Sequence, residues 1–128
     1  MAEKVDYTKK SLIVIGTHGA ENPEKATMTF ACAGAAQSVG IRTKVFLAGE
    51  GVELAKKGFA KKMPKVQGMA PVDELVQGFV DGGGKVLVCI PCMESRGISK
   101  KDFLDGVEFI NLMDFATATL DADRVLTC

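Results

Sequence analysis

Continuous apolar runs alternate with helix-like segments along the whole chain. Runs of this kind, rich in β-branched residues and closed by glycine or a turn, are typical of buried parallel strands. The pattern predicts five strands, at Leu12–Ile15, Lys44–Ala48, Lys85–Ile90, Val107–Leu112 and Arg124–Thr127. The third strand is the most apolar, which predicts the most buried position in the sheet.

The segments between these strands carry signals for the start and end of helices. Asn22-Pro23-Glu24 combines an N-cap, a proline at the first helical position and an acid in the first turn, and this helix is expected to run to about Gly40. The other expected helices are Glu50–Lys57, Val72–Asp81, a short one that begins with a capping box at Ser99–Asp102 and ends at Gly106, and Phe115–Ala122 with Asp114 as its cap.

The alternation of strands and helices predicts a single α/β domain over residues 1–128, built on an open, mainly parallel five-stranded sheet with helices on both faces. Functional groups in such sheets lie at the carboxyl ends of the strands. The sequence therefore directs attention to the loop after Gly16, the loop after Ala48 and the turn after Ile90.

Composition and charge exclude several classes of protein. The formal net charge is zero, so the chain lacks the basic surface of a nucleic-acid-binding protein. The longest apolar runs, such as Val86–Cys92, are too short to span a bilayer. The charged start Met1–Lys10 does not resemble a signal peptide. We therefore expect a cytoplasmic protein with reduced thiols, without nucleic-acid or membrane partners.

The turn after the third strand holds the most informative residues. Cys89 and Cys92 are separated by Ile-Pro, and Arg96-Gly97 follows within one short turn. A thiol is a nucleophile only as thiolate, which nearby positive charge and aligned backbone N–H groups favour. We expect the sheet to present the Cys89 sulfur in an accessible, anion-friendly pocket, where Arg96 supplies the charge and the amides around Gly97 supply the donors.

Three other interpretations of these cysteines are open. Cys89 can be a small apolar core residue, since free cysteine is often buried. A thioredoxin-like centre is disfavoured because Cys89 ends the strand itself and all four prolines precede Cys92. A zinc site is disfavoured because the remaining candidates, Cys32, Cys128 and His18, have no ligand spacing. No metal or other cofactor is expected.

The cysteine turn resembles that of the DsrE/DsrF-like family, which includes the TusD-type sulfur-relay subunits and the YchN-like proteins. The family pattern is a strand ending in Cys, six further residues, then Arg-Gly and an apolar residue. Cys89, Arg96-Gly97 and Ile98 match it in register. The segments Thr17–Pro23 and Asp121–Leu126 agree with the same family.

This resemblance implies a YchN-like three-layer α/β/α fold and a homo-oligomer, a trimer or a hexamer. It also implies a sulfur-carrier or sulfurtransferase-like protein, in which Cys89 holds a persulfide received from a donor protein and passes it to an acceptor protein. Cys92 departs from the simplest family pattern and is either a second acceptor or a resolving thiol. Two alternatives remain open: a dithiol oxidoreductase or peroxiredoxin-like protein that uses Cys89 and Cys92, and a non-catalytic oligomeric interaction protein.

Other residues have both a functional and a structural interpretation. His18 is either a base or donor near the persulfide, or a loop residue bonded to backbone. Cys32 is expected in the core, and Cys128 at the end of an edge strand. A lysine-rich stretch is either a solvated loop or a docking patch for an acidic partner, and its members are Lys56, Lys57, Lys61, Lys62 and Lys65.

Overall fold

Five strands pair in parallel in the order β4-β3-β2-β1-β5. The computed structural model describes residues 5–128, so the first part of the charged start Met1–Lys10 lies outside the described residues. The strands are β1 (Ser11–Gly16), β2 (Arg42–Leu47), β3 (Lys85–Cys89), β4 (Glu108–Ile110) and β5 (Arg124–Thr127). The predicted parallel α/β sheet is therefore confirmed.

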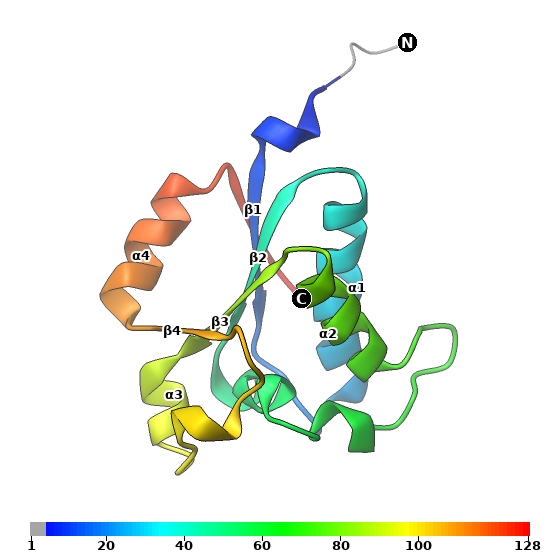
Figure 1. Ribbon diagram of the computed structural model, residues 1–128, viewed down its shortest axis with the longest axis vertical. Helices are drawn as coiled ribbons and strands as arrows, with labels where there is room; N and C mark the ends of the chain where they lie inside the picture. Colours follow the sequence, from blue (N-terminus) through cyan, green and yellow to red (C-terminus); the bar gives the residue numbers. More distant parts are fainter. Residues whose placement is uncertain (1–4) are drawn as a thin grey trace.

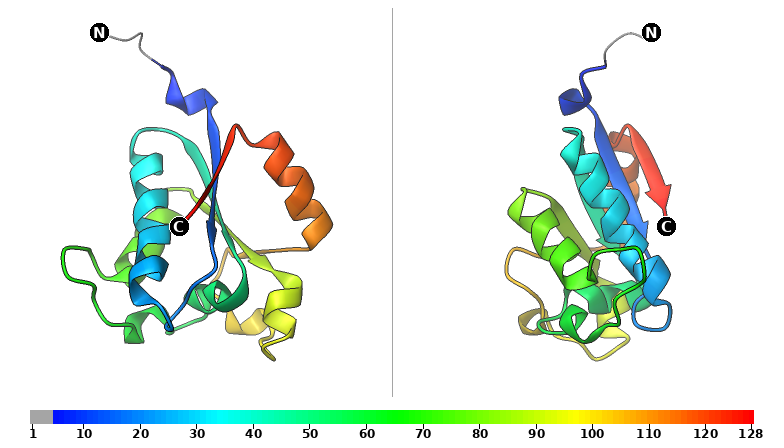
Figure 2. Two further views of the ribbon diagram at one scale, coloured as in Figure 1. Left: turned by 180° about the vertical axis from the view of Figure 1, so that it is seen from behind. Right: turned by 90° about the vertical axis from the view of Figure 1, so that its right-hand side faces the viewer.

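Helices cover both faces of the sheet, which gives three layers (Figure 1). The α-helices are α1 (Pro23–Ser38), α2 (Val72–Asp81), α3 (Ile90–Glu94) and α4 (Leu112–Asp121). Short 3-10 segments are η1 (Tyr7–Lys9), η2 (Gly49–Ala55), η3 (Ala60–Lys62) and η4 (Lys100–Asp102). Figure 2 shows α1 and α2 side by side on one face, with α4 on the other.

Helix α1 begins and packs as its sequence predicts. The Asn22 side chain accepts a hydrogen bond from the Lys25 backbone N–H (3.2 Å), and Pro23 occupies the first helical turn. Phe30 is fully buried and meets Phe79 of α2 edge-on, with ring centroids 6.0 Å apart. This contact joins the two helices over the sheet.

The opposite face of the sheet is more thinly covered. Phe46 of β2 stacks on Phe115 of α4, with ring centroids 3.7 Å apart. No residue of α4 is fully buried, and Met113 and Leu120 are 76% and 86% exposed. The predicted Asp114 cap is wrong: Asn111 caps the helix by accepting the Asp114 N–H (2.8 Å), which places Asp114 inside the first turn.

Differences at the element ends concentrate on the carboxyl side of the sheet. The third strand ends at Cys89, and the expected turn after it is the helix α3, which accommodates Pro91 in its first turn. The predicted Ser99 capping box is present, but it closes only the single turn η4 and the helix does not continue to Gly106. The segment after β2 is the 3-10 segment η2 rather than an α-helix.

Within residues 5–128, we find no helix with the length and apolar character needed to cross a membrane.

Gly51 provides a test of the packing at the carboxyl edge. A Cβ at this buried position would overlap with the carbonyl oxygen of Gly16, at the end of β1. We predict that Gly51→Ala lowers the free energy of unfolding by about 1–3 kcal/mol, because backbone cannot move aside as a side chain can. Gly78 in α2 has open space around it, so Gly78→Ala should raise stability by about 0.5–1 kcal/mol. Urea unfolding measures both, and equal tolerance of the two substitutions would contradict the close approach.

Candidate functional site

The segments that follow β1, β2 and β3 meet at one edge of the sheet, as predicted (Figure 1). A Cβ at Gly19, in the loop after β1, would lie 2.6 Å from the carbonyl oxygen of Glu50 in η2. Segment η2 in turn packs against α3 and β3. The edge therefore brings the His18 loop, the acidic start of η2 and the cysteine helix together.

Cys89 is buried, so the expectation of an accessible sulfur at this residue is wrong for the single chain. Its exposed fraction is 1%, whereas Cys92 is half-buried. The physical reason is that β3 lies between β2 and β4 and passes into α3 without an intervening loop. Cys89 both ends the strand and caps the helix, and Cys92 is the thiol nearer to solvent.

Burial also determines the protonation of Cys89. Burial raises the pKa of the Cys89 thiol to about 11, and the neighbouring Cys92 thiol contributes to this rise. The Cys92 amide and the positive charge of Arg96 lower the pKa, but their effects are smaller. Cys89 is therefore a neutral thiol near pH 7, rather than the activated thiolate that the sequence predicts.

The Arg96 guanidinium donates hydrogen bonds to oxygen atoms rather than to a cysteine thiol. Its guanidinium donates to the Cys92 carbonyl oxygen (3.1 Å) and to a carboxylate oxygen of Glu50 (3.0 Å). Arg96 therefore ties the end of α3 to η2, and it acts on Cys89 only through its charge. Gly97 follows with φ +68°, a left-handed conformation that favours glycine and turns the chain toward η4.

A pair of carboxyl groups in η2 was not identified from the sequence. A hydrogen bond from Glu53 and the Arg96 guanidinium lower the pKa of Glu50, whereas burial and the hydrogen bond to Glu50 raise the pKa of Glu53. Glu53 therefore keeps its proton to a higher pH than Glu50 does. The sequence feature that points to this pair is its position directly after β2, in one of the three loops expected to carry functional groups.

His18 is bonded to a neighbouring side chain rather than to backbone or to a cysteine. Its Nδ1 lies 2.9 Å from a carboxylate oxygen of Glu21. The hydrogen bond from His18 and the backbone N–H of Gly19 lower the pKa of Glu21. The structure therefore places His18 at the correct edge of the sheet but gives it a role in holding its own loop.

A basic cavity of about 440 Å³ opens beside the cysteine helix. Its lining residues are Lys56, Lys57, Arg96, Gly97, Ile98, Lys101 and Asp102. Four of these side chains are cationic and one is acidic, and the Asp102 carboxylate is engaged by the Ser99 N–H (2.9 Å). The cavity therefore favours an anion. Lys61, Lys62 and Lys65 are exposed and do not line it.

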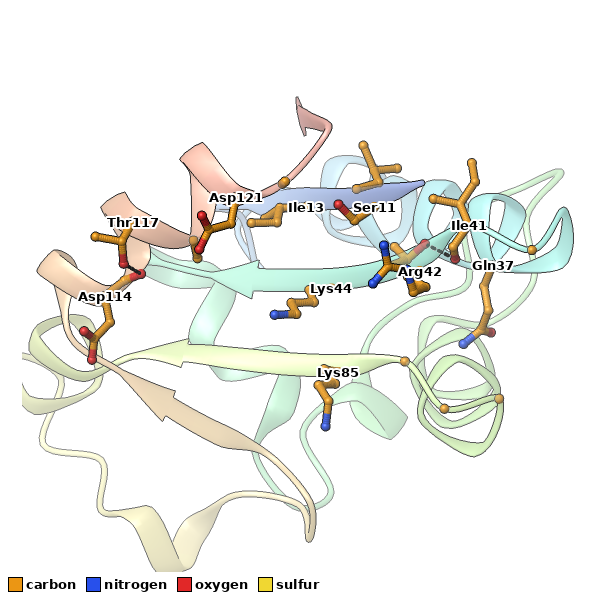
Figure 3. Close-up of a pocket in the computed structure, with 18 residues that line it drawn as sticks. Ser11, Ile13, Gln37, Ile41, Arg42, Lys44, Lys85, Asp114, Thr117 and Asp121 are labelled. Atoms are coloured by element: carbon orange, nitrogen blue, oxygen red, sulfur yellow. Dashed lines mark hydrogen bonds between the residues drawn. The ribbon is translucent and has the colours of Figure 1, made fainter. Parts of the chain in front are cut away.

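A larger hollow of about 750 Å³ lies far from this chemistry (Figure 3). It is enclosed by α4 and the amino-terminal parts of the central strands, opposite to the end that carries the cysteines. Lys44 and Lys85 reach it from the sheet, and Asp114 and Asp121 from α4. It contains none of the site residues predicted from the sequence.

The four free cysteines form two separate neighbouring pairs. Cys89 and Cys92 are at β3 and α3, and Cys32 and Cys128 are at α1 and the end of β5. Cys32 is half-buried rather than enclosed in the core. Within residues 5–128, no group of three or more His, Cys, Asp or Glu side chains is arranged to hold a metal ion.

Comparison with known proteins identifies relatives along almost the whole chain. The DsrE/DsrF-like family matches residues 10–128. The uncharacterized protein MJ0760 of Methanocaldococcus jannaschii is 33% identical over 114 residues, which cover 88% of this chain and 41% of that protein. The uncharacterized protein MK0008 of Methanopyrus kandleri is 33% identical over 87 residues, or 68% of each chain.

The fold has a solved counterpart. The crystal structure of YchN from Escherichia coli superposes with a TM-score of 0.77, at 23% identity, and the match covers 93% of this chain and 99% of YchN. This likeness confirms the three-layer α/β/α fold.

The accessibility of the two site thiols differs enough to be measured. In the native protein at neutral pH, we predict that iodoacetamide modifies Cys92 at least tenfold faster than Cys89, because Cys89 is buried and its raised pKa leaves little thiolate. The Cys89 rate should rise about tenfold per pH unit toward a pKa of about 11. Peptide mass spectrometry follows each site, with denatured protein as the control. Equal native rates would contradict the geometry.

Proposed function

The chain belongs to the DsrE/DsrF-like family, and from this premise we propose that it is a sulfur carrier whose Cys89–Cys92 pair binds a sulfane sulfur and passes it to another protein. The observation that carries the proposal is the arrangement of two neighbouring thiols at the carboxyl edge of the sheet. Cys92 is half-buried, and Cys89 is buried beneath it.

Cys92 is the thiol that receives the sulfur. Its thiolate attacks the outer sulfur of a donor persulfide, R–S–SH; a new S–S bond forms on Cys92, and the donor S–S bond breaks to release R–S⁻. The product is Cys92–S–SH, and no electrons are gained or lost overall. Access decides this assignment, because a donor can reach Cys92 but not the buried Cys89.

Cys89 is the thiol that shelters the sulfur. After losing its proton, its sulfur attacks the outer sulfur of Cys92–S–SH, which moves the persulfide to Cys89 and restores the Cys92 thiol. Cys89 also takes the position that family resemblance gives to the acceptor. Burial at 1% exposure protects a persulfide there from water and oxidants until a partner opens the site.

The basic cavity beside the cysteine helix supports an anionic sulfur donor. Small sulfane-sulfur donors such as polysulfide and thiosulfate are anions, and Lys56, Lys57 and Lys101 surround the cavity that Arg96 shares with the cysteine turn. The Arg96 guanidinium thus lies between the anion-favouring cavity and the carbonyl group of Cys92. Donor and acceptor proteins are expected to approach from this side.

Loading with polysulfide tests the proposal. Intact-mass analysis of the reduced protein should show the gain of one sulfur atom. We predict at least a tenfold loss of loading rate in Cys92→Ser. In Cys89→Ser, a persulfide should form but be lost faster, because it stays at the half-buried Cys92 and cannot move to the buried site. Cys128→Ser is the matched control, since its thiol lies at the end of β5, and it should load normally. An unloaded natural protein, or equal loading and retention in all variants, would contradict the assignment.

A dithiol oxidoreductase is the second candidate, because the same neighbouring thiols can close as a disulfide. In that case Cys89 attacks the inner sulfur of Cys92–S–SH, forming the disulfide and releasing hydrosulfide. Both functions use the same residues but leave different products. Trapped sulfide together with a Cys89–Cys92 disulfide supports the oxidoreductase, whereas a stable extra sulfur supports the carrier.

Assembly into a trimer or a hexamer, in the cytoplasm, is part of the same proposal. It is supported by large apolar side chains that the single chain leaves exposed on α4 and β5, namely Leu112, Met113, Leu120, Val125 and Leu126. Large exposed apolar side chains of this kind on a helix and an edge strand are typical of a protein interface.

Light scattering coupled to size-exclusion chromatography tests the assembly. We predict that the natural protein elutes as an oligomer and that Leu120→Asp shifts it toward the monomer, since this 86% exposed side chain would be buried between subunits. Val39→Asp is the matched control: Val39 is 57% exposed but lies beside the end of α1. A monomeric natural protein, or equal effects of the two substitutions, would contradict the assembly.

A further inference from the structure

A second pair of thiols lies on the α1 face of the sheet, apart from Cys89 and Cys92. Cys32 is in α1 and Cys128 directly follows β5, and both are half-buried. Although 95 residues separate them in the chain, the Cys32 thiol is close enough to Cys128 to interact with it. No part of the proposed sulfur chemistry uses either residue.

The register of the sheet explains why these thiols meet. Ile15 of β1 pairs with Thr127 of β5, and the Cys128 N–H donates to the Ile15 carbonyl oxygen (3.3 Å). Cys128 is therefore the neighbour of Gly16, and in-register neighbours in a parallel sheet point to the same face. A Cβ at Gly16 would lie 2.6 Å from Thr29 of α1, so this face is the one that α1 covers.

The position of Cys32 near Cys128 follows from the same geometry. It lies three residues after Thr29, which places it about one helical turn along the same side of α1. Gly16 has no side chain, so the space between Thr29 and the strand stays narrow. The helix therefore approaches the sheet closely at the position where Cys128 extends β5.

We propose that Cys32 and Cys128 form a second redox site, which closes as a disulfide between α1 and β5 when the protein meets a hydroperoxide. The Cys32 sulfur attacks one peroxide oxygen, forming an S–O bond and breaking the O–O bond, and the first water or alcohol leaves with the thiol proton. Cys128 then attacks that sulfur, the S–S bond forms, the S–O bond breaks and water leaves. Two thiols lose two electrons, which the peroxide gains.

The assignment of the two steps follows from the environment of Cys128. Burial, followed by the neighbouring Cys32 thiol, raises the pKa of Cys128 to about 11. This leaves Cys128 with little thiolate near pH 7, so we assign the first attack on peroxide to Cys32 and the second step to Cys128, which the strand register holds next to α1. The disulfide would join the edge strand β5, whose residues are all exposed, to the helix that packs on β1.

Disulfide mapping tests the site in the natural protein. After treatment with hydrogen peroxide and blocking of free thiols, a non-reducing digest should contain the peptide of Cys32 linked to that of Cys128. The double variant Cys89→Ser/Cys92→Ser should form the same link and, when oxidised, gain about 5–15 °C in Tm, because a bridge that closes a long loop restricts the unfolded chain. Dithiothreitol should remove both the link and the gain in Tm.

The inference does not depend on the sulfur-carrier proposal, because the double variant lacks that site. Adding Cys32→Ser or Cys128→Ser to it should abolish the gain in Tm without changing the Tm of the reduced protein by more than a few degrees. Sulfinic or sulfonic acid on Cys32 without any link to Cys128 would overturn the inference. A link that forms only between molecules would overturn it as well.

Discussion

The direct passage of β3 into α3 is the constraint on which the site depends. Cys89 is at once the last residue of a central strand and the cap of a helix, so its thiol is enclosed between the two. Cys92, one helical turn later, lies nearer to the surface. A single backbone junction therefore produces a sheltered sulfur beneath a reachable one, and each needs the other for transfer.

The positive charges at this end of the sheet act mainly on groups around the thiols rather than on the thiols themselves. Arg96 donates hydrogen bonds to Glu50 and to the end of α3, and burial has the largest effect on the pKa of Cys89. The charge that remains available lies in the adjoining cavity, where Lys56, Lys57 and Lys101 surround space for an anion. The arrangement favours recognition of a donor at the rim and storage of sulfur inside.

The sequence predicts the centre of the sheet well because β1, β2 and β3 contain buried apolar runs, and it predicts the start of α1 because Asn22-Pro23 is a clear helix-start signal. Helix α3 was missed because Pro91 indicates a turn as readily as a first helical turn. The burial of Cys89 and the meeting of Cys32 with Cys128 depend on strand order and register, which periodicity does not reveal. Motif spacing located the site, but tertiary contacts decide which sulfur is accessible.

The central claim is that a mobile sulfur resides in the Cys89–Cys92 pair. The most direct test is to load the natural protein with isotopically labelled polysulfide, alkylate it, and locate the label by tandem mass spectrometry without reduction. The account predicts labelled sulfur on the peptide that contains both residues, removable by a thiol acceptor. Label that is absent from this peptide, or found only on Cys32 or Cys128, would contradict it.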